Sequence, residues 1–465
     1  MSDLPARSAS PLVVLAPVAT LLLSVALLLS GHGLQTTLVP LRGALEHFSA
    51  FSLGLIGSGY YVGFVTGCLI GPRLVVRVGH IRVFTALVAA ASAAALVHAL
   101  AVDPFVWIAL RIVTGMCMAG LYLVIESWLN EHATNETRGL VMSAYIVVNF
   151  SMITLGQLLI TQASPTGFAL FTLASILVSV AAIPVALTNA AQPAPIAVVS
   201  FRPRRLIGIS PVGLIGAFVV GIANGAFWGL GPVFAARADL GADGVAIFMS
   251  AAVLGGALMQ YPVGRMSDFL DRRIVLAGML VLAALSGIAI AILPVSGTAL
   301  LALALVFGAL TLPGYAISAA HAYDHTERSG YVEMAAGLLL FNGAGSIIGP
   351  LAASLAMDHF GGKSLFVFTA VTQTLLALFV VWRMRQRAAV APADKTEFDM
   401  AATAPVGGAI SLEVPDLDED NIVLPDRLDV PAEVVDLDTL MGEVLDDDPH
   451  PEQPEQPRQR NGDAP

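Results

Sequence analysis

The sequence predicts an all-α membrane protein, with twelve transmembrane helices in two pseudo-symmetric six-helix bundles and a disordered acidic C-terminal tail. Three observations lead to this prediction. The chain has a mean hydropathy of +0.79 with only 12% charged residues. About twelve apolar stretches follow one another between Leu12 and Arg387, each near the ~20 residues that a helix needs to cross a bilayer. Basic residues collect in every second connecting segment, as multi-pass membrane proteins require.

The spans are expected to be helices. Only helices and closed barrels satisfy their backbone groups in lipid, and barrel strands would be about half as long and would alternate in polarity. The first span is too long for the apolar region of a secretion signal and lacks a small-residue cleavage site, so we expect it to be retained. The expected spans are residues 12–38, 49–72, 82–101, 104–130, 138–163, 166–188, 208–236, 243–264, 273–293, 297–323, 331–357 and 362–385.

The basic residues beside the spans set the orientation. One side holds Arg7, Arg73, Arg77, Arg82, Arg138, Arg202, Arg204, Arg205, Arg265, Arg272, Arg273, Arg328, Arg383, Arg385 and Arg387, and the other holds Arg42, Arg237 and Lys363. This bias predicts a multi-pass membrane protein with both termini in the cytoplasm. An even number of spans follows from that topology.

The chain also repeats itself at an offset of about 192 residues. The Asn135–Gly139 turn reappears at Glu327–Gly330, and Gly156 has a counterpart in Gly349. Two related halves of six spans are the plan of transporters that rock about a central site. We therefore expect a cytoplasmic N-terminus (1–11), an N-terminal bundle (12–188), a cytoplasmic linker (189–207), a C-terminal bundle (208–387) and a tail (388–465).

The tail carries the acidic charge of the chain. Residues 388–465 hold 20 Asp and Glu against four basic residues, a net charge of −16, whereas the whole chain has −11 and the membrane body therefore has +5. Ten prolines and the lack of an apolar period predict disorder. Apolar patches at 422–424 and 434–437 could dock a protein partner, and the alternative is a solubilising, self-repelling tail.

Several motifs resemble those of a known family. The loop Gly264–Arg273 has a glycine, three residues, an aspartate and paired arginines, and Gly71–Arg82 is a degraded copy with Val76 at the aspartate position. An intramembrane arginine motif follows at Arg111–Gly115, and Leu121–Gly139 contains Glu-Ser-Trp-Leu-Asn-Glu and Arg-Gly. These motifs resemble the major facilitator superfamily, and the last resembles its YcaD-type bacterial branch.

The resemblance runs from about Gly33 to Trp382. It implies a secondary transporter of the bacterial cytoplasmic (inner) membrane that works by alternating access, and it supplies no substrate. The departure at Val76 puts in doubt the usual charge-gated latch of the N-terminal half.

Arg111 is the sharpest candidate for a functional residue. It lies about seven residues inside the fourth span, roughly 10 Å deep at the helical rise. Such an arginine is costly unless it faces a cavity or a partner. One interpretation is that it binds an anionic substrate group or modulates a proton site. The other is a structural tether that bonds helix-end carbonyls.

Charged residues near the cytoplasmic ends predict gating latches. Glu126 lies near the end of the fourth span, within reach of Arg73 or Arg77 in the neighbouring loop. An ion pair there would hold one state closed; a proton-carrying carboxylate and a solvated helix end are the alternatives. Asp268 with Arg272 would form the latch of the C-terminal half, or a solvated loop.

Span two carries Gly59, Gly63, Gly67 and Gly71, which stack on one helix face. Such a ridge of small residues lets helices approach closely in lipid. The ridge would serve either a surface that slides between the halves or static packing.

Other intramembrane polar residues spread over both halves, and each could line a central cavity or form an interhelical hydrogen bond. The substrate or coupling candidates besides Arg111 are Gln35, Asn149, Asn224, Gln260 and Asn342, and Gln157 and His321 complete the set. Tyr60, Tyr61, Tyr122, Phe227 and Trp228 are candidates for aromatic walls. Trp107 and Trp128 are typical of interface anchors.

The sequence contains no phosphate loop, dinucleotide fingerprint, catalytic triad or metal-ligand spacing. Its two cysteines, Cys68 and Cys117, both fall in apolar spans. We therefore expect no enzymatic activity, no cofactor, no metal and no nucleic-acid partner. The expected function is secondary transport of a small organic solute across the lipid bilayer, coupled to protons. The alternative is a transporter-like scaffold or assembly factor that acts through its acidic tail.

Overall fold

The structure, a computed structural model, describes residues 14–134, 136–187, 202–391, 395, 396 and 398. The first half of the chain contains η1 (Ala16–Val18), α2 (Ala19–Leu45), α3 (Ala50–Val78), α4 (His80–Leu100), α5 (Pro104–Glu131), α6 (Arg138–Leu158), η2 (Leu159–Gln162), α7 (Ala169–Val180) and α8 (Ala182–Ala186). The second half contains α9 (Pro203–Ile209), α10 (Pro211–Arg237), α11 (Gly241–Phe269), α12 (Arg272–Ile292), α13 (Gly297–Thr311), α14 (Gly314–Tyr323), η3 (Arg328–Gly330), α15 (Tyr331–Phe360) and α16 (Ser364–Met384).

Twelve segments of the described chain are long and apolar enough to cross a membrane, which confirms the predicted fold class. Two of these spans are each built from two helices, α7 with α8 and α13 with α14. Proline explains both breaks, because it lacks an N–H and its ring clashes with the carbonyl four residues earlier. For Pro184 that carbonyl belongs to Val180, the last residue of α7.

Other prolines lie inside continuous helices. α2 passes through Pro40 to Leu45, and α3 passes through Pro72 to Val78. The expected ends at residues 38 and 72 are therefore wrong, since neighbouring helices can satisfy the backbone groups that a proline frees in a transmembrane helix. The limits of the bundles and the linker stay predictions. Residues 1–13, 188–201 and 399–465, which include most of the predicted tail, lie outside the described residues.

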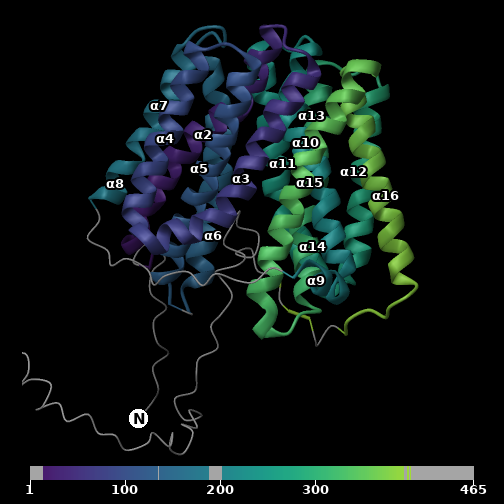
Figure 1. Cartoon of the computed structure of the whole chain (residues 1–465). Coiled ribbons are helices and arrows are strands. Elements are labelled where there is room, and N and C mark those ends of the chain that lie inside the picture. The colour runs from purple at the N-terminus through teal and green to yellow at the C-terminus, as the bar shows by residue number, and fades with distance from the viewer. Residues whose placement is uncertain (1–13, 135, 188–201, 392–394, 397, 399–465) are drawn as a thin grey trace, which may run out of the picture. The chain divides into compact units, whose positions relative to one another are not determined.

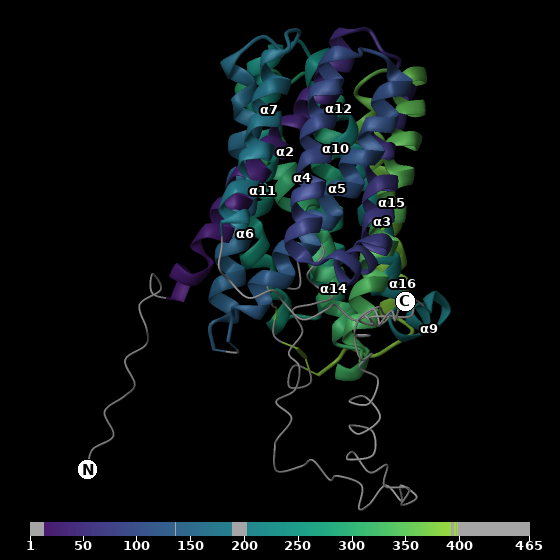
Figure 2. The same cartoon turned by 60° about the vertical axis from the view of Figure 1, so that its left-hand side comes forward.

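The helices of each half pack mainly with one another (Figures 1 and 2). In the first half α3 packs on α5 and α2 on α6, and in the second half α11 packs on α13 and α10 on α15. The most extensive contacts between the halves are α3 with α15, α6 with α11, and α10 with both α2 and α3. A central site between the halves is therefore bordered by α2, α3 and α6 on one side and by α10, α11 and α15 on the other.

Close glycine contacts recur in both halves and show their pseudo-symmetry. At each of these positions a Cβ atom would overlap a backbone carbonyl of the neighbouring helix, so only glycine permits the approach. The matching contacts are Gly63 on Ile112 with Gly255 on Leu305, Gly115 on Tyr60 with Gly308 on Ala252, and Gly156 on Ser30 with Gly349 on Ile222.

The glycine ridge of span two serves packing within one half. Gly59, Gly63, Gly67 and Gly71 face Ile108, Ile112, Met116 and Leu123 in turn, and all four partners belong to α5. The contact between the halves on α3 is made instead by Gly54 and Gly57, which face Ser354 and Pro350 of α15. The ridge therefore fits the static-packing alternative rather than a surface that slides between the halves.

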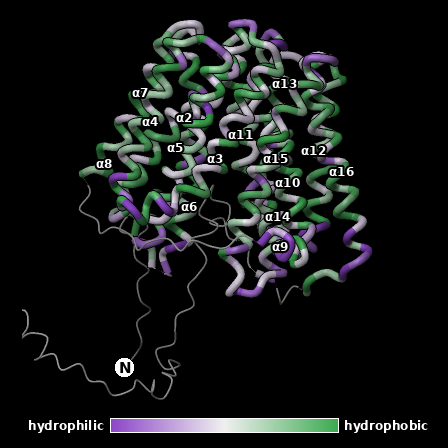
Figure 3. Tube along the Cα trace, viewed as in Figure 1, coloured by the Kyte–Doolittle hydropathy of each residue, from purple (hydrophilic) through white to green (hydrophobic). Residues whose placement is uncertain are grey.

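Apolar side chains cover the outside of the helices. Leu285, Leu375 and Leu378 are among the many large apolar residues that are more than half exposed in the absence of lipid. Figure 3 shows hydrophobic residues along the helices and hydrophilic residues gathered mostly toward their ends. This distribution is that of a bilayer-spanning body, in which lipid replaces water as the solvent.

The basic clusters of the second half meet at one end, here called the arginine-rich end. Arg273 Nη1 donates to the Arg387 carbonyl at 2.8 Å, and Arg387 Nη1 donates to the Ile209 carbonyl at 3.2 Å. Arg202 makes two hydrogen bonds of 3.0 Å to the Glu333 carboxylate. Which side of the membrane this end faces stays a prediction.

Two tryptophans differ from their expected role as interface anchors. Trp107 is 0% exposed and its indole N–H donates to the carbonyls of His98 and Ala101, at 3.2 and 2.8 Å. Trp128 is likewise buried. Both side chains pack inside the first half, because the hairpin before α5 and the neighbouring helices cover them.

Candidate functional site

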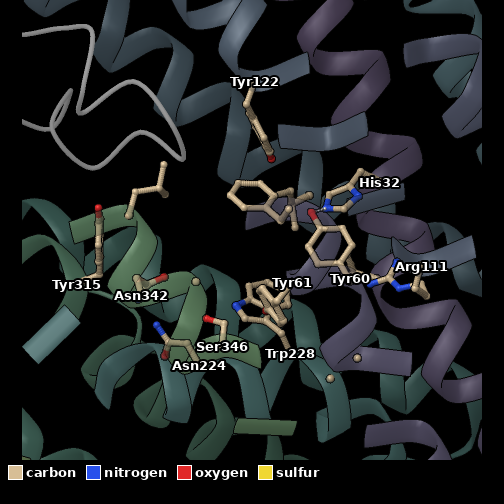
Figure 4. Close-up of a pocket in the computed structure, with 17 residues that line it drawn as sticks. His32, Tyr60, Tyr61, Arg111, Tyr122, Asn224, Trp228, Tyr315, Asn342 and Ser346 are labelled. Carbon is tan, nitrogen blue, oxygen red and sulfur yellow. Dashed lines mark hydrogen bonds between the residues drawn. The ribbon is translucent and has the colours of Figure 1, made fainter. Parts of the chain in front are cut away.

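A cavity of about 290 Å³ lies between the two halves. Helices α2, α3, α5 and α6 line it from the first half, and α10, α14 and α15 line it from the second. Figure 4 shows the labelled side chains converging on this space from both halves. Its position between the pseudo-symmetric bundles is where transporters built from two repeats hold their substrates.

Arg111 supplies the charge of the cavity. Asp103 caps α5 and Pro104 begins it, so that the helix carries Arg111 about two turns into the membrane body. The guanidinium stands over the Tyr60 ring with Cζ 4.4 Å from the ring centroid, a cation–π contact. The Arg111 side chain is buried and Nη1 has no hydrogen-bond partner among the described residues. No carboxylate of the described chain forms an ion pair with it.

Tyr60 links Arg111 to a histidine of the first span. Its hydroxyl lies 3.3 Å from His32 Nε2, and the two rings stack with centroids 5.5 Å apart (Figure 4). His32 Nδ1 is buried without a partner among the described residues. His32 is not among the residues predicted from the sequence, although a titratable residue in the middle of an apolar span is itself a signal of function.

Aromatic rings form much of the cavity wall. A row of rings in the first half runs from Tyr61 through Tyr60 and Phe64 to Tyr122, and neighbouring ring centroids are 5.4 to 6.4 Å apart. Trp228 and Tyr315 face them from the second half. The predicted wall residue Phe227 is instead buried in the apolar core against Phe307, because it lies on the other face of α10 from Trp228.

The second half contributes the neutral polar groups. Asn224, Asn342 and Ser346 line the cavity together with Gly343. Asn342 Nδ2 donates to the Ala217 carbonyl at 3.0 Å, and Ser346 donates to the Gly221 carbonyl at 3.2 Å, so both side chains are held against α10. Asn224 Oδ1 is buried without a partner among the described residues, so it can accept a hydrogen bond from a ligand.

The other candidate residues from the sequence lie elsewhere. Gln35, Asn149 and Gln260 are buried but are not among the residues that line the cavity. Gln157 Oε1 accepts from Ser250 at 3.4 Å, and this contact joins α6 to α11. The roles of Gln35, Asn149 and Gln260 as substrate or coupling residues stay predictions.

Contacts between the halves close the cavity away from the arginine-rich end. The Asp358 carboxylate accepts hydrogen bonds from the Ala50 and Phe51 amides, at 3.1 and 3.0 Å, at the first turn of α3. Further along α3 and nearer the cavity, Ser58 donates to the Ile347 carbonyl at 2.6 Å. Among the hydrogen bonds between described residues, those that join the halves all lie beside the cavity or on this closed side.

The predicted latch of the first half has a different arrangement in this conformation. Glu126 is 0% exposed and accepts a hydrogen bond from the Tyr145 hydroxyl at 2.8 Å. Arg73 and Arg77 are exposed, and Arg73 Nη1 donates to the Leu69 carbonyl of its own helix at 3.3 Å. Glu126 therefore lies deeper than the solvated helix end of the sequence analysis, and its pairing with Arg73 or Arg77 stays a prediction for another state.

In the second half the predicted pair is present. Arg272 Nη2 lies 3.7 Å from Asp268 Oδ1, and Arg272 Nε makes a shorter bond of 2.7 Å to Asp324 Oδ2. The side chain of Arg272 is 1% exposed, and Asp324 was not among the predicted latch residues. His321, one of the intramembrane polar residues singled out from the sequence, is buried beside His325 and is not among the residues that line the cavity. Whether these contacts act as a gate stays a prediction.

Comparisons with known proteins agree with this geometry. A family model described as Major Facilitator Superfamily matches residues 213–414, and one described as Sugar (and other) transporter matches residues 24–191. The uncharacterized MFS-type transporter YcaD of Shigella flexneri is 28% identical over 375 residues, which cover 78% of this chain and 95% of that protein. YcaD of Escherichia fergusonii is 26% identical over 371 residues, which cover 79% and 96%.

Solved structures show the same fold. The nucleoside transporter NupG matches with a TM-score of 0.65 at 13% identity, over 80% of this chain and all of that one. A bacterial homolog to the human lysosomal transporter Spinster, in an inward-facing and occupied conformation, matches with a TM-score of 0.67 at 14% identity, over 84% and 99%.

Proposed function

The chain belongs to the major facilitator superfamily of membrane transporters, and from this premise we propose that it is a secondary transporter that moves a small organic anion by alternating access. The observation that carries the proposal is Arg111. A buried guanidinium costs about 3 kcal/mol at the centre of a membrane helix on insertion scales. Here the described chain offers it an aromatic ring but no carboxylate and no helix-end carbonyl. An anionic ligand would supply the missing countercharge.

The other residues that line the cavity indicate the chemistry of the rest of the ligand. The aromatic rings of Tyr60, Tyr61 and Trp228 offer flat apolar surface, and the Asn224 carbonyl oxygen offers a hydrogen-bond acceptor. A volume of about 290 Å³ lies at the lower limit of small-molecule pockets, which favours a metabolite-sized solute. The ligand that fits these features has one negative group, an apolar body and a hydrogen-bond donor.

Alternating access would exchange the contacts that close the two ends. The hydrogen bonds from α3 to Asp358 and Ile347 would break when the closed side opens. The halves would then meet at the arginine-rich end. In that state Glu126 of α5 is the candidate for an ion pair with Arg73 or Arg77 of α3, a latch within the first half. Such an exchange between two sets of contacts is how rigid halves rock about a fixed site.

Proton coupling is the second element of the proposal. Glu126 is a carboxyl group inside the membrane body, and its hydrogen bond from Tyr145 would position it for protonation. A buried intramembrane carboxyl that faces a polar partner is the usual element of a proton relay. Glu126 would therefore act as both latch and proton carrier, since neutralising it would release an ion pair.

Counterflow in proteoliposomes tests the proposal. Purified protein should exchange a radiolabelled organic anion, found by screening carboxylates, sulfonates and phosphate esters, across the vesicle membrane. Arg111→Ala should abolish exchange, and Arg111→Lys should retain a part of it, because the charge remains but the planar contact on Tyr60 is lost. Arg237→Ala, at the end of α10 and away from the cavity, is the matched control and should exchange normally. Full activity of Arg111→Ala would remove Arg111 from the site.

A further inference from the structure

A short segment beyond the last helix lies against the junction between α11 and α12. Lys395 Nζ donates to the Leu270 carbonyl at 2.5 Å and to the carbonyls of Ser267 and Asp268 at 3.4 Å each. These carbonyls belong to the C-terminal end of α11, where helix carbonyls lack partners and a cation is favourable. Lys395 therefore caps α11 from outside the bundle.

Thr396 continues the contact on α12 and α14. Its amide and its hydroxyl both donate to Asp324 Oδ1, at 3.1 and 2.9 Å. Its carbonyl accepts from Arg272 Nη2. Asp324 and Arg272 are themselves an ion pair with side chains 2% and 1% exposed. Thr396 thus completes the hydrogen bonding of a buried charged pair, which is the condition for such a pair to be tolerated.

Phe398 closes the arrangement. Its amide donates to Asp268 Oδ1 at 2.9 Å, and its ring packs against the apolar cluster that contains Val263. The ring also covers Gly264 so closely that a Cβ atom there would overlap it. The glycine and the aspartate of the Gly264–Arg273 motif are therefore both in contact with this residue.

We propose that Lys395, Thr396 and Phe398 form an intramolecular clamp that docks on the groove made by Gly264, Asp268, Arg272 and Asp324 and restrains the second half. The clamp ties the end of α11, the start of α12 and the end of α14 into one unit. It occupies Asp268 and Arg272, the two residues of the predicted latch. Release of the clamp frees this latch, and exchange between the two states of the protein becomes faster.

Docking can be measured without any transport substrate. A chain that ends at Ala391 should bind a fluorescent peptide of residues 392–402 in trans, as read by anisotropy. A chain that ends at residue 402 should not, because its own segment fills the groove. The same peptide with Lys395→Ala and Phe398→Ala should bind at least about tenfold more weakly, since it lacks the cap and the aromatic anchor. Equal binding of both peptides, or none, would overturn the docking site.

Trypsin provides a second measurement on the full-length chain, in which the membrane body is intact. The Lys395–Thr396 bond should be cut slowly in the wild type. It should be cut at least about fivefold faster in Phe398→Ala, because a contact worth about 1 kcal/mol changes the released population by that factor. Thr396→Glu should have the same effect, since a carboxylate there would face Asp324. Unchanged cleavage in both variants would contradict the clamp.

The restraining effect of the clamp can be measured at the closed side, by how often that side opens. A cysteine at Ser58, with Cys68 and Cys117 replaced by serine, reports opening of the closed side through its reaction with a maleimide. Phe398→Ala should raise this rate at least about twofold, whereas Asp399→Asn, at the next position in the sequence, is the control and should leave the rate unchanged. If the peptide docks as expected but the rate in Phe398→Ala is unchanged, the segment binds the groove without restraining the second half, and the restraining role of the clamp is wrong. The proposed transport function would not be affected by this result.

Discussion

Asp358 provides the most direct test of how the closed side is held. It lies at the end of α15 and accepts two amide hydrogen bonds from the first turn of α3, in the other half of the protein. Asp358→Asn keeps the shape of the side chain and one acceptor oxygen, but it removes the charge and the second acceptor. We expect the closed side to open more often in this variant.

The magnitude follows from the exposure of the carboxylate. Hydrogen bonds to a charged group contribute about 1.5–3 kcal/mol when they are shielded from water. Asp358 is exposed, and an anion at an exposed helix N-terminus contributes only about 0.3–1 kcal/mol. Loss of the charge and of one bond should therefore cost about 1 kcal/mol. The ratio of closed to open molecules should fall about fivefold.

The assay is modification of the Ser58→Cys reporter by a membrane-impermeant maleimide. Ser58 is buried at the contact between the halves and reacts only when they separate. Asp103→Asn is a matched control, because Asp103 accepts from two amides of α5, at 2.9 and 3.1 Å, within the first half alone. Asp358→Asn should react about fivefold faster than wild type, and Asp103→Asn at the wild-type rate. Equal rates in all three proteins would show that the hydrogen bonds to Asp358 do not hold the closed side shut.

Three further predictions concern packing, pH and coupling. Gly63→Ala should lower the free energy of unfolding by about 1–3 kcal/mol, since the added Cβ would overlap the Ile112 carbonyl. Gly278→Ala, which has open space around it, should not lower it, and thermal unfolding of the two variants measures the difference. Burial, the largest single influence on Asp271, acts to raise its pKa, but hydrogen bonds from the Arg273 side chain and amide together with the Arg273 charge outweigh it, so the pKa of Asp271 is lowered. This stabilisation is present above the ordinary carboxyl pKa and is lost as the pH falls through the lower folded value. Asp271→Asn should therefore unfold more readily than the wild type at pH 7, and the difference should shrink as the pH falls below the ordinary carboxyl pKa. Glu126→Gln should abolish uptake driven by a pH gradient while counterflow continues, and gradient-driven uptake at the wild-type rate would exclude Glu126 as the proton carrier.

The twelve spans could be predicted because the length and hydropathy of a transmembrane helix are set by the bilayer alone. The glycine pair of the repeat, Gly156 and Gly349, has equivalent roles in the two halves, since Gly156 of α6 faces a carbonyl of α2 and Gly349 of α15 faces a carbonyl of α10. Helix ends near Pro40 and Pro72 were predicted wrongly, because in lipid the neighbouring helices decide whether a proline ends a helix.

The candidate site could be predicted only in part. Arg111, Asn224 and Asn342 line the cavity, and all three could be singled out from the sequence because polar residues are rare in membrane spans. Which polar residues face the cavity depends on the rotation of each helix, and the weak amphipathic pattern of these spans does not reveal it. Gln35 and Gln260 point elsewhere for that reason. The Asp324 partner of Arg272 and the contact of Phe398 on Gly264 join segments far apart in the sequence, so no local pattern predicts them.

The central claim is that an anion binds at Arg111 between the halves. Ligand-dependent thermal unfolding of the purified protein tests it, with a panel of aromatic and aliphatic carboxylates, sulfonates and phosphate esters beside matched neutral amides and amines. At least one anion should raise the unfolding temperature of the wild type and of Arg237→Ala but not of Arg111→Ala. Stabilisation by neutral or cationic compounds alone, or an equal response of Arg111→Ala, would contradict the account.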